Sequence, residues 1–413
     1  MASKTILILG GGVGGLVAAN ELRRLLPAEH RVVLVEKNAR HAFAPSFLRL
    51  MTGDRRPEQI TCDMRQLIRP GVELIVAEAQ AIDPTNRSVQ TSAQTLNYDY
   101  LIVALGADLA PEAMPALAEA AHTYFTLDGA AKLRDALQAF NGGKVAVVVS
   151  ALPYKCPKTP HKGAMLIADT LRKRGLRDKS EVHLFTPEPQ PMPVAGPALG
   201  DAVKQMLAGK GVIFHPLHKL TTVNASAREL SFEGKESFTF DLLVAIPPHR
   251  GPKVAREAGL TNEAGWVPVD RATLKTKHEN VYALGDATVI PIPGRWKPDV
   301  PLVLPKAGVF AHAQAEVVAH RIAAEIAGAE TQRAFFGDGY CMLEAGEDLA
   351  GFAYGNFFAE PSPQIELRQM GWVWHMGKVL FEQWWLAPYG LRRETLRLAL
   401  TLGGKGMGIP VSL

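Results

Sequence analysis

The 413-residue sequence provides enough chain for two or three domains with a sizeable core. Apolar residues make up 47% of it and charged residues 21%, which is typical of an ordered globular protein and excludes a disordered one. The formal net charge of +4 is too small to indicate a nucleic-acid partner.

The first predicted strand, Thr5–Leu9, leads into a glycine-rich turn. Gly10, Gly12 and Gly15 satisfy the pattern G-x-G-x-x-G, and a segment with helical character follows them. The next apolar strand ends at Glu36, about 20 residues later, where an acidic side chain can accept hydrogen bonds from ribose hydroxyls. Strand, glycines, helix, strand and acid in this order predict a dinucleotide-binding unit.

Two later turns favour FAD as the dinucleotide. A strand from Asp99 runs into Ala104 and Gly106, and another ends in Gly285 and Asp286. This order is similar to that of two-dinucleotide-domain flavoproteins, in which the acid of the last turn binds the ribityl chain. The complete set of candidate FAD-binding residues is Gly10, Gly12, Gly15, Glu36, Pro45, Ala104, Gly106, Gly285, Asp286, Lys306 and Gly308.

The loop after the strand at 144–149 lacks the glycines that a second dinucleotide needs. It reads Ser150-Ala-Leu-Pro-Tyr-Lys-Cys156-Pro. A pyrophosphate requires close approach of the backbone at a helix N-terminus, which glycines permit. The loop therefore argues against NAD(P)H as the reductant and makes Cys156 the candidate through which electrons enter.

A helix predicted from about residue 306 to 327 closes the FAD-binding part. Its N-terminus, with Lys306 and Gly308, is expected to face the flavin, where the positive end of the helix dipole stabilises negative charge. A solvated Lys306 is an equally open alternative. Cys341 follows this helix, where the chain can return past the flavin. Cys62 is expected to pack as a small apolar residue, and the cysteine and histidine spacings predict no metal site.

The predicted fold is α/β, with two Rossmann-like domains and a C-terminal amphipathic segment. We expect residues 1–108 and 251–335 to form the two segments of the FAD-binding domain. Residues 109–250 are expected to form the second Rossmann-like domain, with strands at 144–149 and 181–186 and a helix at 163–172. Residues 336–413 are expected to form a C-terminal region that contains the second cysteine and the amphipathic, membrane-binding segment.

The C-terminal segment predicts attachment to a membrane surface. Four of the six tryptophans lie in it, and a leucine-rich stretch from Leu391 to Leu402 carries Arg392, Arg393 and Arg397. Apolar and aromatic residues opposite a basic face are typical of an interfacial helix. Contacts within a dimer or between domains are the alternative. No apolar run reaches the roughly 20 residues that span a bilayer, and the first strand lies too early for a cleaved secretory signal.

These motifs together resemble the sulfide:quinone oxidoreductases and the flavoprotein subunit of flavocytochrome c sulfide dehydrogenase. The resemblance rests on the FAD glycines, Cys156, the segment 305–308, Tyr340-Cys341 and the segment 378–386. It implies that Cys156 and Cys341 form the sulfide-oxidising pair beside FAD. It also implies that the amphipathic segment binds a membrane quinone, which Lys378 and Phe381 contact.

The chain departs from this family pattern at two places. Residues 107–127 lack the third cysteine that many members carry, and Pro160-His161-Lys162 stands where a Pro-Tyr-Glu stretch is common. The second departure leaves the general base open, with His161 as a candidate because a neutral imidazole accepts a proton near pH 7.

We therefore expect an FAD-dependent sulfide:quinone oxidoreductase. It is expected at the cytoplasmic side of a membrane, bound to its lipid surface, and a homo-oligomer is possible. One alternative is a type 2 NADH:quinone oxidoreductase, which the missing second glycine motif disfavours. The other is a flavin-bearing protein without catalysis, which the presence of both cysteines disfavours.

Overall fold

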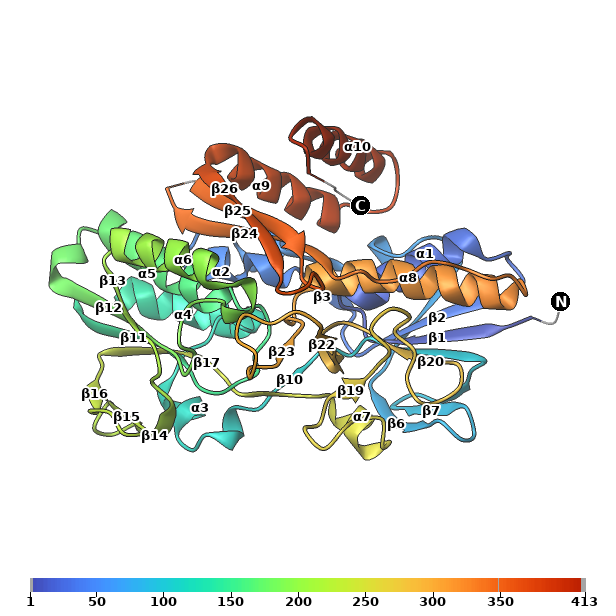
Figure 1. Ribbon diagram of the computed structural model, residues 1–413, viewed down its shortest axis with the longest axis horizontal. Coiled ribbons are helices and arrows are strands. Elements are labelled where there is room, and N and C mark those ends of the chain that lie inside the picture. The colour runs from blue at the N-terminus through green and yellow to red at the C-terminus, as the bar shows by residue number, and fades with distance from the viewer. Residues whose placement is uncertain (1–2, 348, 410–413) are drawn as a thin grey trace.

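The computed structural model describes residues 3–347 and 349–409. Its first layer is a parallel sheet of five strands in the order β20-β9-β1-β2-β5. Helices α1 and α8 pack against each other and cover one face of this sheet (Figure 1). The bounds are β1 Thr5–Leu9, β2 Arg31–Glu36, β5 Val72–Val76, β9 Tyr100–Val103, β20 Val281–Ala283, α1 Val13–Leu25 and α8 Gly308–Ile326.

A second parallel sheet has four strands in the order β13-β12-β11-β17. Its strands and helices are β11 Gly143–Val149, β12 Ser180–Phe185, β13 Val212–His215, β17 Leu242–Ile246, α4 Leu127–Ala139, α5 Thr159–Lys173 and α6 Pro197–Gly209. The strands expected at 144–149 and 181–186 lie within one residue of β11 and β12. The helix expected at 163–172 begins four residues earlier, because Pro160 is tolerated in the first turn of a helix.

A third sheet joins the two halves. Antiparallel strands β24 (Asp338–Gly346), β25 (Leu349–Asn356) and β26 (Gln364–Gly371) carry α9 (Trp372–Leu386) and α10 (Leu391–Gly406) above them (Figure 1). Strand β24 contacts both α5 of the second half and α8 of the first. Residues that follow β11 and residues on β24 therefore meet at the junction of the two halves.

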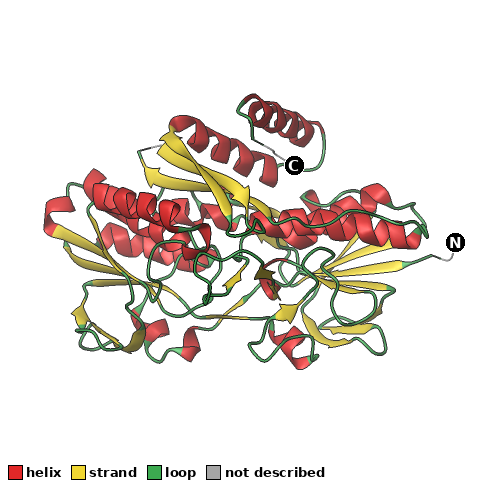
Figure 2. Cartoon of the chain, viewed as in Figure 1, coloured by secondary structure: helices red, strands yellow, loops and turns green. Residues whose placement is uncertain are grey.

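The remaining elements are short. Figure 2 shows the main helices of both halves on one side of the sheets and most of the smaller elements on the other. Their bounds are β3 Arg40–Ala42, β4 Thr61–Asp63, β6 Ala79–Asp83, β7 Ser88–Thr91, β8 Thr95–Asn97, β10 Asp108–Leu109, β14 Leu220–Asn224, β15 Glu229–Phe232, β16 Phe238–Thr239, β18 His249–Arg250, β19 Val267–Pro268, β21 Thr288–Val289, β22 Pro291–Ile292, β23 Leu302–Val303, α2 Phe47–Met51, α3 Leu117–Ala120 and α7 Lys253–Glu257. The chain passes between the two main sheets at β10 and β18, which pair with each other. The domain boundaries expected from the sequence remain a prediction.

The C-terminal helices differ in part from the sequence-based expectation. Trp374, Trp384 and Trp385 are buried among protein side chains, so Trp372 is the exposed tryptophan of the four. Arg393 was expected to face lipid, but it is buried and donates hydrogen bonds to two backbone carbonyls. Its guanidinium also lies over the Trp384 ring at 5.0 Å. Arg393 therefore packs inside the protein against Trp384 and does not face lipid. Within the described residues, none of the helices has the length and apolarity needed to span a bilayer.

Candidate functional site

The first glycine turn forms a cradle at the N-terminus of α1. A Cβ on Gly15 would lie 1.8 Å from the Gly10 carbonyl oxygen, and one on Gly10 would lie 2.5 Å from that of Ala104. These two glycines are thus required by the close approach of backbone segments. A Cβ on Gly12 or Gly106 would instead meet open space within 4 Å. This open space beside a helix N-terminus without a side-chain cap fits a bound pyrophosphate.

Glu36 lies at the same end of the cradle. Its carboxylate accepts a hydrogen bond from the backbone N–H of Gly11 at 2.7 Å and another from that of Asn38 at 2.9 Å. The end of β2 therefore holds an acceptor beside the glycine turn, where a ribose hydroxyl of the dinucleotide would donate. Pro45, which had also been a candidate, is exposed in the 3₁₀ turn Ala44–Ser46.

Asp286 carries an unpartnered buried atom in the turn between β20 and β21. Its Oδ1 has no hydrogen-bond partner among the described residues. Burial raises the pKa of this carboxyl, although Lys155 and Lys306 oppose the shift. A buried carboxylate oxygen without a donor is costly unless a ligand supplies one. The hydroxyl groups of a ribityl chain are suitable donors, so Asp286 fits the FAD site.

Lys306 is held just before the N-terminus of α8. Its ammonium group donates hydrogen bonds of 2.8 Å to the carbonyls of Asp286 and Thr288, and it lies 3.5 Å from the centre of the Trp266 ring. The alternative of a solvated lysine is therefore wrong. Burial lowers the pKa of Lys306 to about 8, against the opposing effect of Asp286.

Both candidate cysteines line one cavity of about 410 Å³. Cys156 lies in the loop after β11, and Cys341 lies on β24. Lys158 lines the same cavity and attracts both sulfur atoms electrostatically. Burial raises the pKa of Cys341, and Lys158 opposes that shift by stabilising the thiolate. Within the described chain, the three cysteines have free thiols.

The backbone fixes Cys156 next to the FAD-binding segment. Its N–H donates a 2.6 Å hydrogen bond to the carbonyl of Lys306. Cys156 also has a φ of 60°, in the left-handed region that non-glycine residues seldom adopt. Such strain costs about 1–3 kcal/mol and persists at sites where the surrounding structure enforces it. The loop thus places this sulfur at the junction of the two halves, beside α8.

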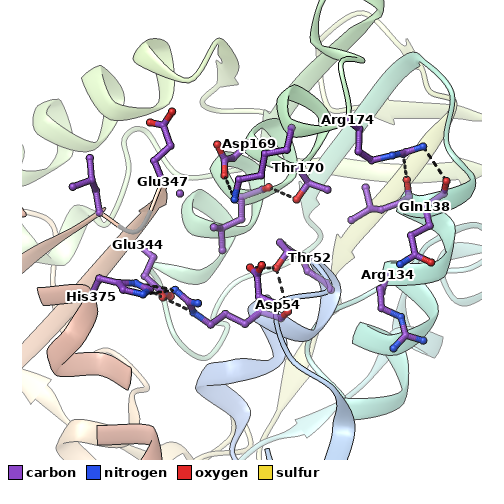
Figure 3. A pocket seen from close by; sticks show the side chains of 17 residues that line it. Thr52, Asp54, Arg134, Gln138, Asp169, Thr170, Arg174, Glu344, Glu347 and His375 are labelled. Carbon is purple, nitrogen blue, oxygen red and sulfur yellow. Dashed lines mark hydrogen bonds and ion pairs between the residues drawn. The ribbon is translucent and has the colours of Figure 1, made fainter. Parts of the chain in front are cut away.

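A second buried cluster lies farther along β24, around Glu344, three positions after Cys341. Glu344 accepts from Lys378, from Lys162 at 3.0 Å and from Arg49 at 3.0 Å. Although burial opposes it, Lys162, Lys378 and Arg49 hold the pKa of Glu344 well below its usual value. Figure 3 shows Glu344 and His375 on one wall of the neighbouring cavity of about 240 Å³. We call Arg49, Lys162, Glu344 and Lys378 the Glu344 cluster.

The two candidate quinone residues have different surroundings on α9. Lys378 is buried in the Glu344 cluster, and burial together with the nearby Lys162 lowers its pKa to about 7. Phe381 packs against Phe43 and Trp384, with ring centres 6.1 and 5.3 Å away, and lines an apolar cavity of about 60 Å³ between α9 and α10. They are three positions apart in α9, so they occupy neighbouring positions on one helix.

His161 is not placed to act as a base. It is buried in α5 and is absent from the residues that line the cysteine cavity. Its Nδ1 lies 3.2 Å from the carbonyl of Pro157, and burial lowers its pKa to about 4. The sequence-based candidate is wrong because the buried His161 ring packs near Phe214 of β13 and does not line the cavity. Lys158 and Glu344 were missed, although a lysine two positions after a loop cysteine was a visible signal.

Comparison with known proteins agrees with this geometry. The pyridine nucleotide-disulphide oxidoreductase family matches residues 4–315, which is most of the chain. The chain belongs to this family. Together with the glycine cradle and the unpartnered Asp286 carboxylate, membership confirms the prediction of an FAD-dependent oxidoreductase.

Relatives within the family are similar over different shares of the chain. The sulfide-quinone reductase of Aquifex aeolicus is 27% identical over 397 residues, which cover 93% of this chain and 90% of the relative. The X-ray structure of the sulfide:quinone oxidoreductase from Aquifex aeolicus has a TM-score of 0.83 and 25% identity and covers 92% of this chain and 90% of that one. A type II NADH:quinone oxidoreductase of Staphylococcus haemolyticus is 22% identical and covers 85% of this chain and 90% of the relative.

Proposed function

We propose that this protein oxidises sulfide through Cys156 and Cys341 and passes the electrons through FAD to a membrane quinone. The carrying observation is the cavity in which both cysteines and Lys158 meet beside the N-terminus of α8. Similarity to sulfide-quinone reductases supports the same substrates. The loop after β11 lacks the glycines of a second dinucleotide site, which supports sulfide over NADH.

In the proposed reaction, hydrosulfide attacks a disulfide formed by Cys156 and Cys341. A bond forms between the substrate sulfur and one cysteine sulfur, the disulfide bond breaks, and its electron pair leaves with the other cysteine as a thiolate. The ammonium of Lys158 stabilises that thiolate through its electrostatic attraction to both sulfur atoms. FAD, when bound, supplies the means to take up the electron pair and hand it to the acceptor.

On the acceptor side, we propose that quinone approaches through the apolar cavity at Phe381. This cavity is lined by residues of β24, α9 and α10, among them Tyr340 and Leu400. Tyr340 directly precedes Cys341 and also lines the cysteine cavity. Residues of β24 therefore line both cavities. This supports entry of electrons in the cysteine cavity and their exit to quinone in the cavity at Phe381.

Exposed apolar side chains on α9 and α10 support attachment to a lipid surface. Trp372 is 67% exposed, Leu391 86%, Leu398 56% and Leu402 60%. Leu391, Leu398 and Leu402 are spaced by seven and four residues and so share one side of α10. Large apolar side chains left in water on one face are typical of an interfacial helix.

Replacing Leu391, Leu398 and Leu402 together by serine is expected to release the protein from lipid vesicles. The three side chains contact little else, so the fold and the reduction of flavin by sulfide are expected to persist. Sedimentation with vesicles of phosphatidylcholine and phosphatidylglycerol measures binding. Leu217→Ser, at an equally exposed leucine between β13 and β14, is the matched control. Undiminished sedimentation of the triple variant would contradict the lipid-binding face.

The proposed function as a whole is tested by two half-reactions. Anaerobic mixing with sodium sulfide is expected to bleach the flavin absorbance. Subsequent mixing of the reduced protein with a short-chain quinone is expected to restore it. A flavin that sulfide leaves oxidised, or a reduced flavin that quinone does not reoxidise, would contradict the corresponding half of the proposal.

A further inference from the structure

Glu188 is a buried carboxyl in the cavity that holds the two cysteines. It follows β12 by three residues, and its side chain lines the same cavity as Cys156 and Cys341. Among the described residues that line this cavity, it is the only carboxyl. The proposed reaction uses Lys158 and the two sulfur atoms and leaves Glu188 without a role.

Two hydroxyl groups hold the Glu188 carboxyl in place. Tyr154 donates to its Oε2 at 2.8 Å and Thr186 donates to the same oxygen at 3.2 Å. Tyr154 lies two residues before Cys156, and both Glu188 and Cys156 act on its hydroxyl and raise its pKa further above the level set by burial. The Tyr154 hydroxyl therefore connects the carboxyl with the cysteine loop.

The surroundings of Glu188 suit proton transfer near neutral pH. Burial raises its pKa to about 7, and the hydrogen bonds from Tyr154 and Thr186 oppose that shift. The other titratable groups that line the cavity are Tyr154, Cys156, Lys158, Lys306, Tyr340, Cys341 and Tyr354. A general base works best when its pKa lies close to the working pH.

A purely structural role does not require a carboxyl at this position. Both hydroxyls donate to one oxygen of Glu188. The amide oxygen of a glutamine could accept the same two hydrogen bonds, and a neutral amide is less costly to bury than a charged carboxylate. Packing therefore does not explain why this buried side chain is an acid that can gain and lose a proton.

We propose that Glu188 is the proton acceptor for sulfide in the cysteine cavity, a role that rests on the proposed function. The carboxylate of Glu188 takes a proton from hydrogen sulfide bound in the cavity. The sulfur of the hydrosulfide so formed then bonds to one cysteine as the disulfide breaks. The electron pair stays on the leaving thiolate, which Lys158 stabilises. Tyr154 positions the carboxylate toward the cysteine loop.

The test is Glu188→Gln, with the limiting rate of anaerobic flavin reduction measured at saturating sodium sulfide from pH 5 to 9. Saturating sulfide is used because the pH dependence of the limiting rate reports the pKa values of groups in the substrate complex. Loss of a general base costs about 100-fold or more, so we expect that deficit at pH 8. The deficit should shrink toward nothing at pH 5, where Glu188 of the unaltered protein is protonated. Glu233→Gln, in an exposed pair with Lys219, is the matched control.

Two further measurements separate this role from structural damage. The infrared band of a protonated carboxyl should titrate near pH 7 in the unaltered protein and vanish in Glu188→Gln, with no substrate present. Tyr154→Phe should shift that titration while FAD stays bound. A deficit in Glu188→Gln that is the same at pH 5 and pH 8, or no deficit, would overturn the inference. If sulfide leaves the unaltered protein oxidised at every pH, the proposed function itself fails.

Discussion

Cys156→Ser and Cys341→Ser are each expected to abolish the reduction of flavin by sulfide. Both sulfur atoms line one cavity and interact with Lys158, and a relay through a disulfide requires both. We expect the rate in stopped-flow measurements to fall by at least about a thousandfold, as it does for groups that act as one unit. FAD should remain bound, because the glycine cradle and Asp286 use neither sulfur.

The controls for this prediction lie in the same chain. Cys62 is half-buried in β4, where it pairs with His41 of β3, and it does not line the cysteine cavity. Cys62→Ser should therefore leave the rate nearly unchanged. The double variant at 156 and 341 should be no slower than either single variant. Rapid reduction of Cys156→Ser by sulfide would contradict the proposed route of electrons.

Glu344→Gln is expected to lower the free energy of unfolding by about 3 kcal/mol. Its carboxylate is 2% exposed and pairs with Lys162, Lys378 and Arg49, so its loss leaves buried cations without a counter-charge. Removing one partner of a buried ion pair costs about 3–5 kcal/mol. We expect a loss at the lower end of this range because Lys378, with a pKa of about 7, can lose its proton and so relieve part of the repulsion among the buried cations. Urea denaturation at pH 8 measures the change.

The same cluster predicts how the loss depends on pH. Glu344 raises the pKa of Lys378, so this pKa falls below about 7 in Glu344→Gln. Between the Lys378 pKa values of the two folded proteins, raising the pH deprotonates Lys378 and stabilises the variant alone. The deficit of Glu344→Gln should accordingly be larger at pH 6 than at pH 8. Glu73→Gln, in a half-exposed pair with Arg31, should change stability by less than about 1 kcal/mol. Equal losses in the two variants would contradict the cluster.

Local pattern predicted the parts of the site that depend on backbone geometry. Gly10 and Gly15 are needed because a Cβ would collide with backbone, and Glu36 accepts from the glycine turn. The parallel strands β1, β2, β11 and β12 were recognisable because buried parallel strands are continuous apolar runs. These features are local, so a single sequence carries their signal.

The sequence carried no comparable signal for side chains that meet across the three sheets. Glu344, Lys162 and Arg49 come from β24, α5 and α2, and their pairing depends on the docking of the C-terminal sheet at the junction. His161 failed as a base because its buried side chain packs near Phe214 of β13 and not in the cysteine cavity. Arg393 failed as a lipid contact because it lies buried over the rings of Trp384 and Tyr389 and donates to backbone carbonyls. Long-range packing decided each of these cases.

The most direct test of sulfide as the reductant compares it with NADH in one anaerobic stopped-flow experiment. The loop Ser150–Pro157 contains no glycine, and its cysteine lies in the cavity beside α8. Micromolar sulfide is therefore expected to bleach the flavin much faster than NADH at the same concentration. Rapid bleaching by NADH, with sulfide slow or inert, would contradict oxidation of sulfide through Cys156 and Cys341 and would favour an NADH:quinone oxidoreductase.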